Sequence, residues 1–240
     1  MKLTKEKLRR MILREMGIFP KIPKDVNLNI GNAILAYDNS DLIGEAIASI
    51  SGDNSKKPKV GGIPTGHGAC ALIDAKGNVT GVSFGPPLCK KAIVKAEPLM
   101  VQFKVNVLEL GNVLKHIDNS GRLKKSAGNA VISLMLKKKM FRGTKIHYYG
   151  YDNVDVDQCL QQAGANGRCK MYTVVPQGYD MGMELDTDNC ASFAIDVVAA
   201  GKADIGSSWI QGALFASPSV MIPAANITFG GSQIKGTYSR

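Results

Sequence analysis

The sequence predicts an α+β protein in which an antiparallel sheet packs against helices. Segments with the two-residue period of strands and segments with helical spacing both occur, without regular strand–helix–strand repetition. The clearest strand signal is a hairpin pattern over residues 67–84. With 240 residues and 45% hydrophobic composition, the chain has enough apolar surface to bury a core.

The N-terminal region predicts a basic helical appendage with a linker, over residues 1–57. Within 3–16, apolar residues recur at helical spacing among charged ones, and Gly17 and Pro20 end the pattern. A second helix is expected over 41–50, where apolar residues again share one face. The following stretch is rich in Gly, Pro, Ser and Lys, and it indicates an exposed loop.

The main sheet is predicted to begin at His67. An apolar run over 69–73, turn residues around Gly77 and an alternating segment over 79–84 indicate a β-hairpin. Further strands and helices are expected in chain order: a strand over 100–108, helices over 109–118 and 122–139, a strand over 145–149, a helix capped by Asp152 or Asn153 and closed by Gly164, a strand over 170–175, and a helix over 191–200. We therefore predict a main domain over 58–220 and a tail over 221–240.

The net charge of +10 is concentrated in two segments. Residues 1–24 hold eight Lys or Arg against two Glu, and residues 122–145 hold eight Lys or Arg with no acidic residue. Either segment is suited to an anionic partner. The alternative is a solvated helix face, because neither run has the interleaved aromatics of a surface that stacks bases.

Cysteine usage favours reduced thiols and argues against a metal site. The five cysteines are an odd number in a chain too long to need disulfides, and no CxxC pair accompanies the three histidines. We expect no metal and no cofactor. No apolar run is long enough for a transmembrane or secretory segment, so we expect a cytoplasmic protein.

Cys190 and His67 are the candidate catalytic residues. Asp188 or Asn189 can cap the helix that Cys190 begins, and backbone N–H groups and the helix dipole there favour a thiolate. An imidazole beside it supplies a general base. The alternative is structural, since a cysteine in an apolar helix is usually a small core residue and a lone histidine usually packs.

Two segments resemble a known family. Residues 188–201 read DNCASFAIDVVAAG, and residues 66–85 read GHGACALIDAKGNVTGVSFG. They are similar to the cysteine helix and histidine hairpin of circularly permuted papain-like proteins, which include NlpC-type peptidases, PPPDE peptidases and lecithin–retinol acyltransferase-like enzymes. The resemblance implies a permuted papain-like fold with Cys190 as nucleophile and His67 as base. Ser83 takes the orienting position, where relatives have a stronger group.

The function implied by this resemblance is thiol hydrolysis of an amide bond or acyl transfer, with a peptide, peptidoglycan or acyl substrate. The basic N-terminal segment also resembles leaders of tailed-phage virion proteins. A non-catalytic virion or interaction protein that kept the scaffold is therefore the alternative. Binding of an anionic polymer through residues 1–24 and 122–145 is a third.

Overall fold

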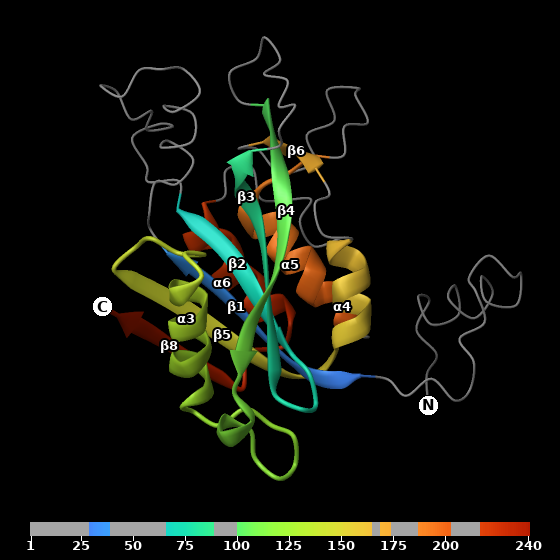
Figure 1. The fold of residues 1–240 in the computed structure, drawn as a ribbon, viewed down its shortest axis with the longest axis vertical. Helices are drawn as coiled ribbons and strands as arrows, with labels where there is room; N and C mark the ends of the chain where they lie inside the picture. Colours follow the sequence, from blue (N-terminus) through green and yellow to red (C-terminus); the bar gives the residue numbers. More distant parts are fainter. Residues whose placement is uncertain (1–28, 39–65, 89–99, 165–168, 174–186, 203–216) are drawn as a thin grey trace, which may run out of the picture.

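The computed structural model describes residues 29–38, 66–88, 100–164, 169–173, 187–202 and 217–240 (Figure 1). In chain order the elements are β1 (Ile30–Asp38), β2 (His67–Ile73), β3 (Asn78–Leu88), β4 (Met100–Asn112), the 3-10 helix η2 (Leu114–His116), α3 (Ala127–Lys137), β5 (Lys145–Asp155), α4 (Val156–Ala163), β6 (Cys169–Thr173), β7 (Thr187–Asp188), α5 (Cys190–Gly201), α6 (Pro218–Thr228) and β8 (Ile234–Ser239). All eight strands join one sheet. The predicted α+β class is confirmed.

The strand order in the sheet is β7-β6-β4-β3-β2-β1-β5-β8. Neighbouring strands run antiparallel, except for the parallel pair β6 and β7. β1 lies between β2 and β5, and its residues from Gly31 to Asp38 are all buried. A strand buried on both faces reads as a nearly continuous apolar run, which is what residues 30–37 show.

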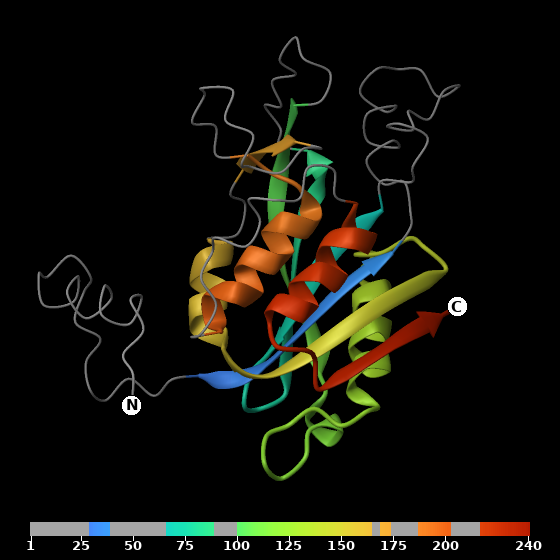
Figure 2. The ribbon, with the colours of Figure 1, turned by 180° about the vertical axis from the view of Figure 1, so that it is seen from behind.

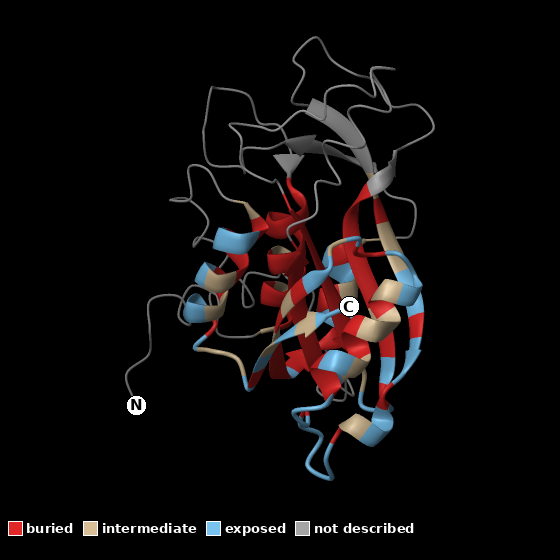
Figure 3. Cartoon of the chain, turned by 90° about the vertical axis from the view of Figure 1, so that its left-hand side faces the viewer, coloured by how far each residue is buried: buried red, intermediate tan, exposed pale blue. Residues whose placement is uncertain are grey.

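Helices cover both faces of the sheet (Figures 1 and 2). α4, α5 and α6 pack on one side, which we call the α5 face, and α3 packs on the other, the α3 face. Because side chains alternate along a strand, β1 sends Leu35 into the α5-face core and Ile34 into the α3-face core. Figure 3 shows buried residues on the strands and on the adjoining helix surfaces.

Two glycines let helices approach the sheet closely. A Cβ added at Gly68 would lie 3.0 Å from the Cα of Ala191, so the start of α5 sits directly on β2. A Cβ at Gly128 would overlap the ring of Tyr148, so α3 sits directly on β5. The first of these contacts brings the start of α5 to the start of the predicted hairpin.

The structure confirms several predicted elements and corrects others. The hairpin is present as β2 and β3, and the expected helix over 122–139 is present in part, as α3 over 127–137. The helix expected over 109–118 is wrong, because β4 stays paired with β3 to Asn112 and only η2 follows. α4 is capped by Asp155 rather than by Asp152 or Asn153, because β5 continues to Asp155 in its pairing with β1.

The predicted domain boundaries do not coincide with the folded unit. β1 lies outside 58–220 but pairs with β2 and β5 in the middle of the sheet. β8 lies in the predicted tail but pairs with β5. The helices expected over 3–16 and 41–50 lie outside the described residues. Across the described ranges, no helix is long and apolar enough to cross a membrane.

Candidate functional site

Cys190 is the first residue of α5, as the capping signal predicted. The side chain of Asn189 accepts hydrogen bonds from the backbone N–H groups of Ala191 at 2.9 Å and Ser192 at 2.8 Å, so Asn189 is the N-cap. The thiol is 1% exposed and lies in the α5-face core. Its sulfur accepts a hydrogen bond from the N–H of Gly68 at 3.4 Å.

His67 opens β2, and its side chain lies on the α3 face. Its ring contacts the ring of Phe141 at a centroid distance of 5.7 Å, and Phe141 belongs to the α3-face core. In register it lies opposite Asp38 of β1. Burial lowers the pKa of His67 to about 4, against the opposing effect of the Asp38 carboxylate. The imidazole is therefore neutral at pH 7.

The structure does not bring Cys190 and His67 together as a dyad. Gly68 faces α5, and consecutive residues of a strand point to opposite faces, so His67 points away from Cys190. The thiol instead meets the backbone of the residue after the histidine. The sheet thus separates the predicted nucleophile from the predicted base.

Ser83 shares the α3 face with His67 but does not lie directly opposite it. Ser83 is buried and pairs with Ala69, two residues along β2. The position nearest the imidazole on β3 is Gly85, where an added Cβ would lie 3.4 Å from the ring carbon Cε1. The charged side chain nearest to His67 on the neighbouring strand is that of Asp38. It was not predicted from the sequence, because no strand was expected over residues 30–38.

Asp38 also holds the segment between α3 and β5. Its Oδ2 accepts hydrogen bonds from the backbone N–H groups of Arg142 at 3.2 Å and Gly143 at 2.7 Å. A Cβ at Gly143 would lie 2.8 Å from the Cβ of Asp38, so the backbone at Gly143 packs directly against the end of β1. This buried carboxylate fixes the backbone of residues 142–143 against the end of β1.

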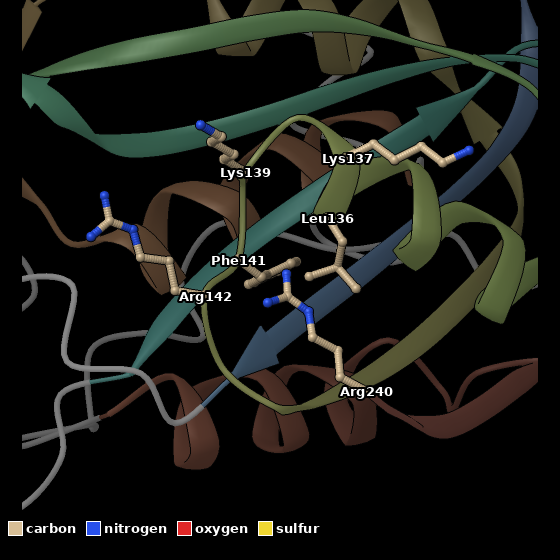
Figure 4. Close-up of a pocket in the computed structure, with 6 residues that line it drawn as sticks. All are labelled: Leu136, Lys137, Lys139, Phe141, Arg142 and Arg240. Carbon is tan, nitrogen blue, oxygen red and sulfur yellow. The ribbon is translucent and has the colours of Figure 1, made fainter.

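A pocket of about 360 Å³ opens beside the same segment (Figure 4). It lies where the end of α3, the connection to β5 and the end of β8 meet. Its lining consists of two apolar side chains and four cationic ones: Leu136, Phe141, Lys137, Lys139, Arg142 and Arg240. Among the described residues, no carboxylate side chain lines this pocket.

The segment that follows α3 has an unusual residue at its turn. The N–H of Met140 donates to the carbonyl of Met135, and that of Lys139 to the carbonyl of Leu136. This pair of hydrogen bonds is typical of a helix end with one residue in the left-handed conformation, and that residue is usually glycine. Here that residue is Lys139, with φ of 59°.

The remaining thiols with described surroundings are buried. Cys70 and Cys159 are free, as expected, and burial raises the pKa of both, that of Cys159 to about 12. Cys89 and Cys169 lie outside the residues whose side chains are described. Within the described part of the chain, no group of three or more His, Cys, Asp and Glu residues is arranged to hold a metal ion.

Comparison with known proteins identifies no relative: no family model, curated protein or solved structure matches the chain.

Proposed function

We propose that this protein binds nucleic acid through a basic face formed by the end of α3, the start of β5 and β8. We define the basic face by seven exposed cations along the β8 edge of the sheet: Lys137, Lys138, Lys139, Arg142, Lys145, Lys235 and Arg240. Lys145 and Lys235 alternate with Ile146 and Ile234 of the α3-face core, so they extend toward the other side of that edge. The observation that carries the proposal is that residues 119–151 and 217–240, which supply this face, contain no Asp or Glu.

The fold gathers these cations from distant parts of the chain. β8 pairs with β5 so that Ser239 lies opposite Lys145, and the N–H of Arg240 donates to the carbonyl of Thr144 at 3.0 Å. Lys235 lies opposite Tyr149 on the same strand pair. Two segments about a hundred residues apart therefore present positive charge along the β8 edge of the sheet.

Such a face suits a polymer with regularly spaced negative charge. Each phosphate neutralised by Lys or Arg releases condensed counterions, which favours binding and makes it depend on salt. If about five of the seven cations contact phosphates, affinity for a single strand should fall roughly 100-fold between 50 and 200 mM salt. A duplex should show a somewhat steeper loss.

Charge reversal tests the proposal. The variant carrying Lys145→Glu and Lys235→Glu should bind a DNA oligonucleotide at least tenfold more weakly than the parent. A matched control carries Lys76→Glu and Lys115→Glu, which make the same charge change in the β2–β3 turn and in η2. If both double variants lose affinity equally, the effect comes from net charge alone and the basic face is not the site.

A second candidate is the cysteine-dependent hydrolase or acyltransferase of the papain-like resemblance. The observation that favours it is the Cys190 sulfur at the capped start of α5, within reach of the Gly68 N–H. Both features stabilise a thiolate. Because His67 lies on the other face of the sheet, this chemistry requires a different general base. The non-catalytic alternative is a virion or interaction protein that keeps the papain-like scaffold without the activity.

A further inference from the structure

The pocket within the basic face differs from the rest of that face in shape. Its six lining residues border an open depression of about 360 Å³, a volume within the usual range of small-ligand sites. An internal phosphate of a nucleic-acid strand is flanked by sugars on both sides, so it contacts a convex surface more easily than it enters a pocket. The terminal phosphate of a nucleic-acid strand can enter a pocket.

Arg240 gives the pocket a cationic side chain that can bind an anion. Figure 4 shows its guanidinium beside Phe141 and Leu136, while Lys137, Lys139 and Arg142 extend to other sides. Arg240 is exposed, and the planar fork of its guanidinium can bind two phosphate oxygens at once. The lysine stems are long and rotatable, so their ammonium groups can turn toward a bound anion.

Lys139 supplies an independent indication. A side chain other than glycine is strained in the left-handed conformation, and strain of this kind concentrates at functional sites. Cations at the end of a helix also interact favourably with its dipole, which accounts for Lys137 and Lys138 without any ligand. That explanation does not require a strained lysine, nor an arginine from β8.

The backbone of the pocket is held before any ligand arrives. The two hydrogen bonds from Arg142 and Gly143 to buried Asp38 fix the segment between α3 and β5. Phe141 is 1% exposed and packs against the ring of His67. A preformed site loses little conformational entropy on binding.

We infer that this pocket binds the phosphate monoester at the end of a nucleic-acid strand. A phosphate monoester carries a charge of about −1.5 to −2 at pH 7, against −1 for an internal phosphodiester. Four cations without a carboxylate favour the more highly charged group. The inference rests on the proposed function and adds that the protein distinguishes a phosphorylated strand end.

The experiment compares two single-stranded oligonucleotides of one sequence, one with a 5′-phosphate and one with a 5′-hydroxyl, by fluorescence anisotropy with the full chain. The phosphorylated strand should bind on the order of tenfold more tightly. The preference should shrink at pH 5, because the second pKa of the phosphate is about 6. A strand with a 3′-phosphate extends the test to the other end.

Variants locate the effect. Arg240→Gln and Lys139→Gly should each reduce the preference to twofold or less. Lys138→Ala is the matched control, because Lys138 lies on the basic face but does not line the pocket. It should weaken both strands equally and keep the preference.

Each result has one meaning. If the parent protein shows no preference for a 5′-phosphate and none for a 3′-phosphate, the inference fails while the proposed function stands. A preference that survives in both pocket variants also overturns the inference, because the phosphate then binds elsewhere. If no strand binds in a salt-dependent way, the proposed function fails as well.

Discussion

Asp38 and His67 lie directly opposite each other on β1 and β2, both buried on the α3 face of the sheet. The pair connects the middle of the sheet to the basic pocket. Asp38 holds the backbone of Arg142 and Gly143, and His67 packs against Phe141. His67, which the resemblance assigned to a thiol active site, therefore supports a cationic surface together with Asp38.

Asp38→Ala should destabilise the protein by about 2–4 kcal/mol, because it leaves two N–H groups without their charged acceptor. Asp38→Asn keeps one acceptor oxygen, so its loss should be smaller. Chemical denaturation with urea measures both. An unchanged free energy of unfolding in Asp38→Ala would mean that these bonds do not hold the segment.

His67 should make the protein less stable in acid. Its pKa of about 4 in the folded state lies below the unfolded value of about 6.5, so the unfolded chain takes up the proton first as the pH falls. The contribution is complete above about pH 6.5 and is lost between pH 6.5 and 4. Its size is about 3 kcal/mol.

The measurement is the free energy of unfolding of the parent and of His67→Gln at several pH values. Subtracting the two removes the titration of shared groups. The parent should lose stability relative to the variant as pH falls toward 4. Parallel curves across this window would show that the imidazole is not held neutral by burial.

Lys139→Gly should stabilise the protein by about 1 kcal/mol, since glycine adopts the left-handed conformation without strain. Lys138→Gly is the control, because Lys138 has φ of −91° and gains nothing from glycine. Thermal unfolding compares the two variants. If Lys139→Gly lowers the melting temperature, Lys139 is not strained, and backbone strain no longer supports a functional site at the pocket.

Iodoacetamide at pH 6 should label Cys190 slowly in the folded protein, because Cys190 is 1% exposed and His67 lies on the other face of the sheet. The rate should be the same in parent and His67→Gln, with both proteins shown to be folded at pH 6. Mass spectrometry of tryptic peptides gives the rate for each cysteine. Rapid labelling of Cys190 that depends on His67 would restore the catalytic dyad.

The sequence was informative where the signal is local. The hairpin over 67–84 follows from alternation around turn residues, and the start of α5 follows from Asn189 as a capping residue. β1 was missed because a strand buried on both faces has no alternation to detect. β8 was missed because a short edge strand containing Gly236 carries a weak strand signal.

The site depends on relationships that a sequence does not display. The dyad prediction placed His67 correctly at a strand start and Cys190 at a helix start. It did not establish which face of β2 the helix covers, and a shift of one residue exchanges the faces. The positive charge of residues 122–145 was evident from the sequence. That Arg240 lies beside this segment follows only from the pairing of β5 with β8.

In the proposed function, the basic face binds the phosphates of nucleic acid. Its most direct test is the affinity of the full chain for a single-stranded oligonucleotide at several salt concentrations. With about five phosphate contacts, a plot of log K against log salt should be linear with a slope near −3.5. The variant with Lys145→Glu and Lys235→Glu should have a shallower slope. A slope near zero, or the same slope in parent and variant, would show that the basic face does not bind phosphates.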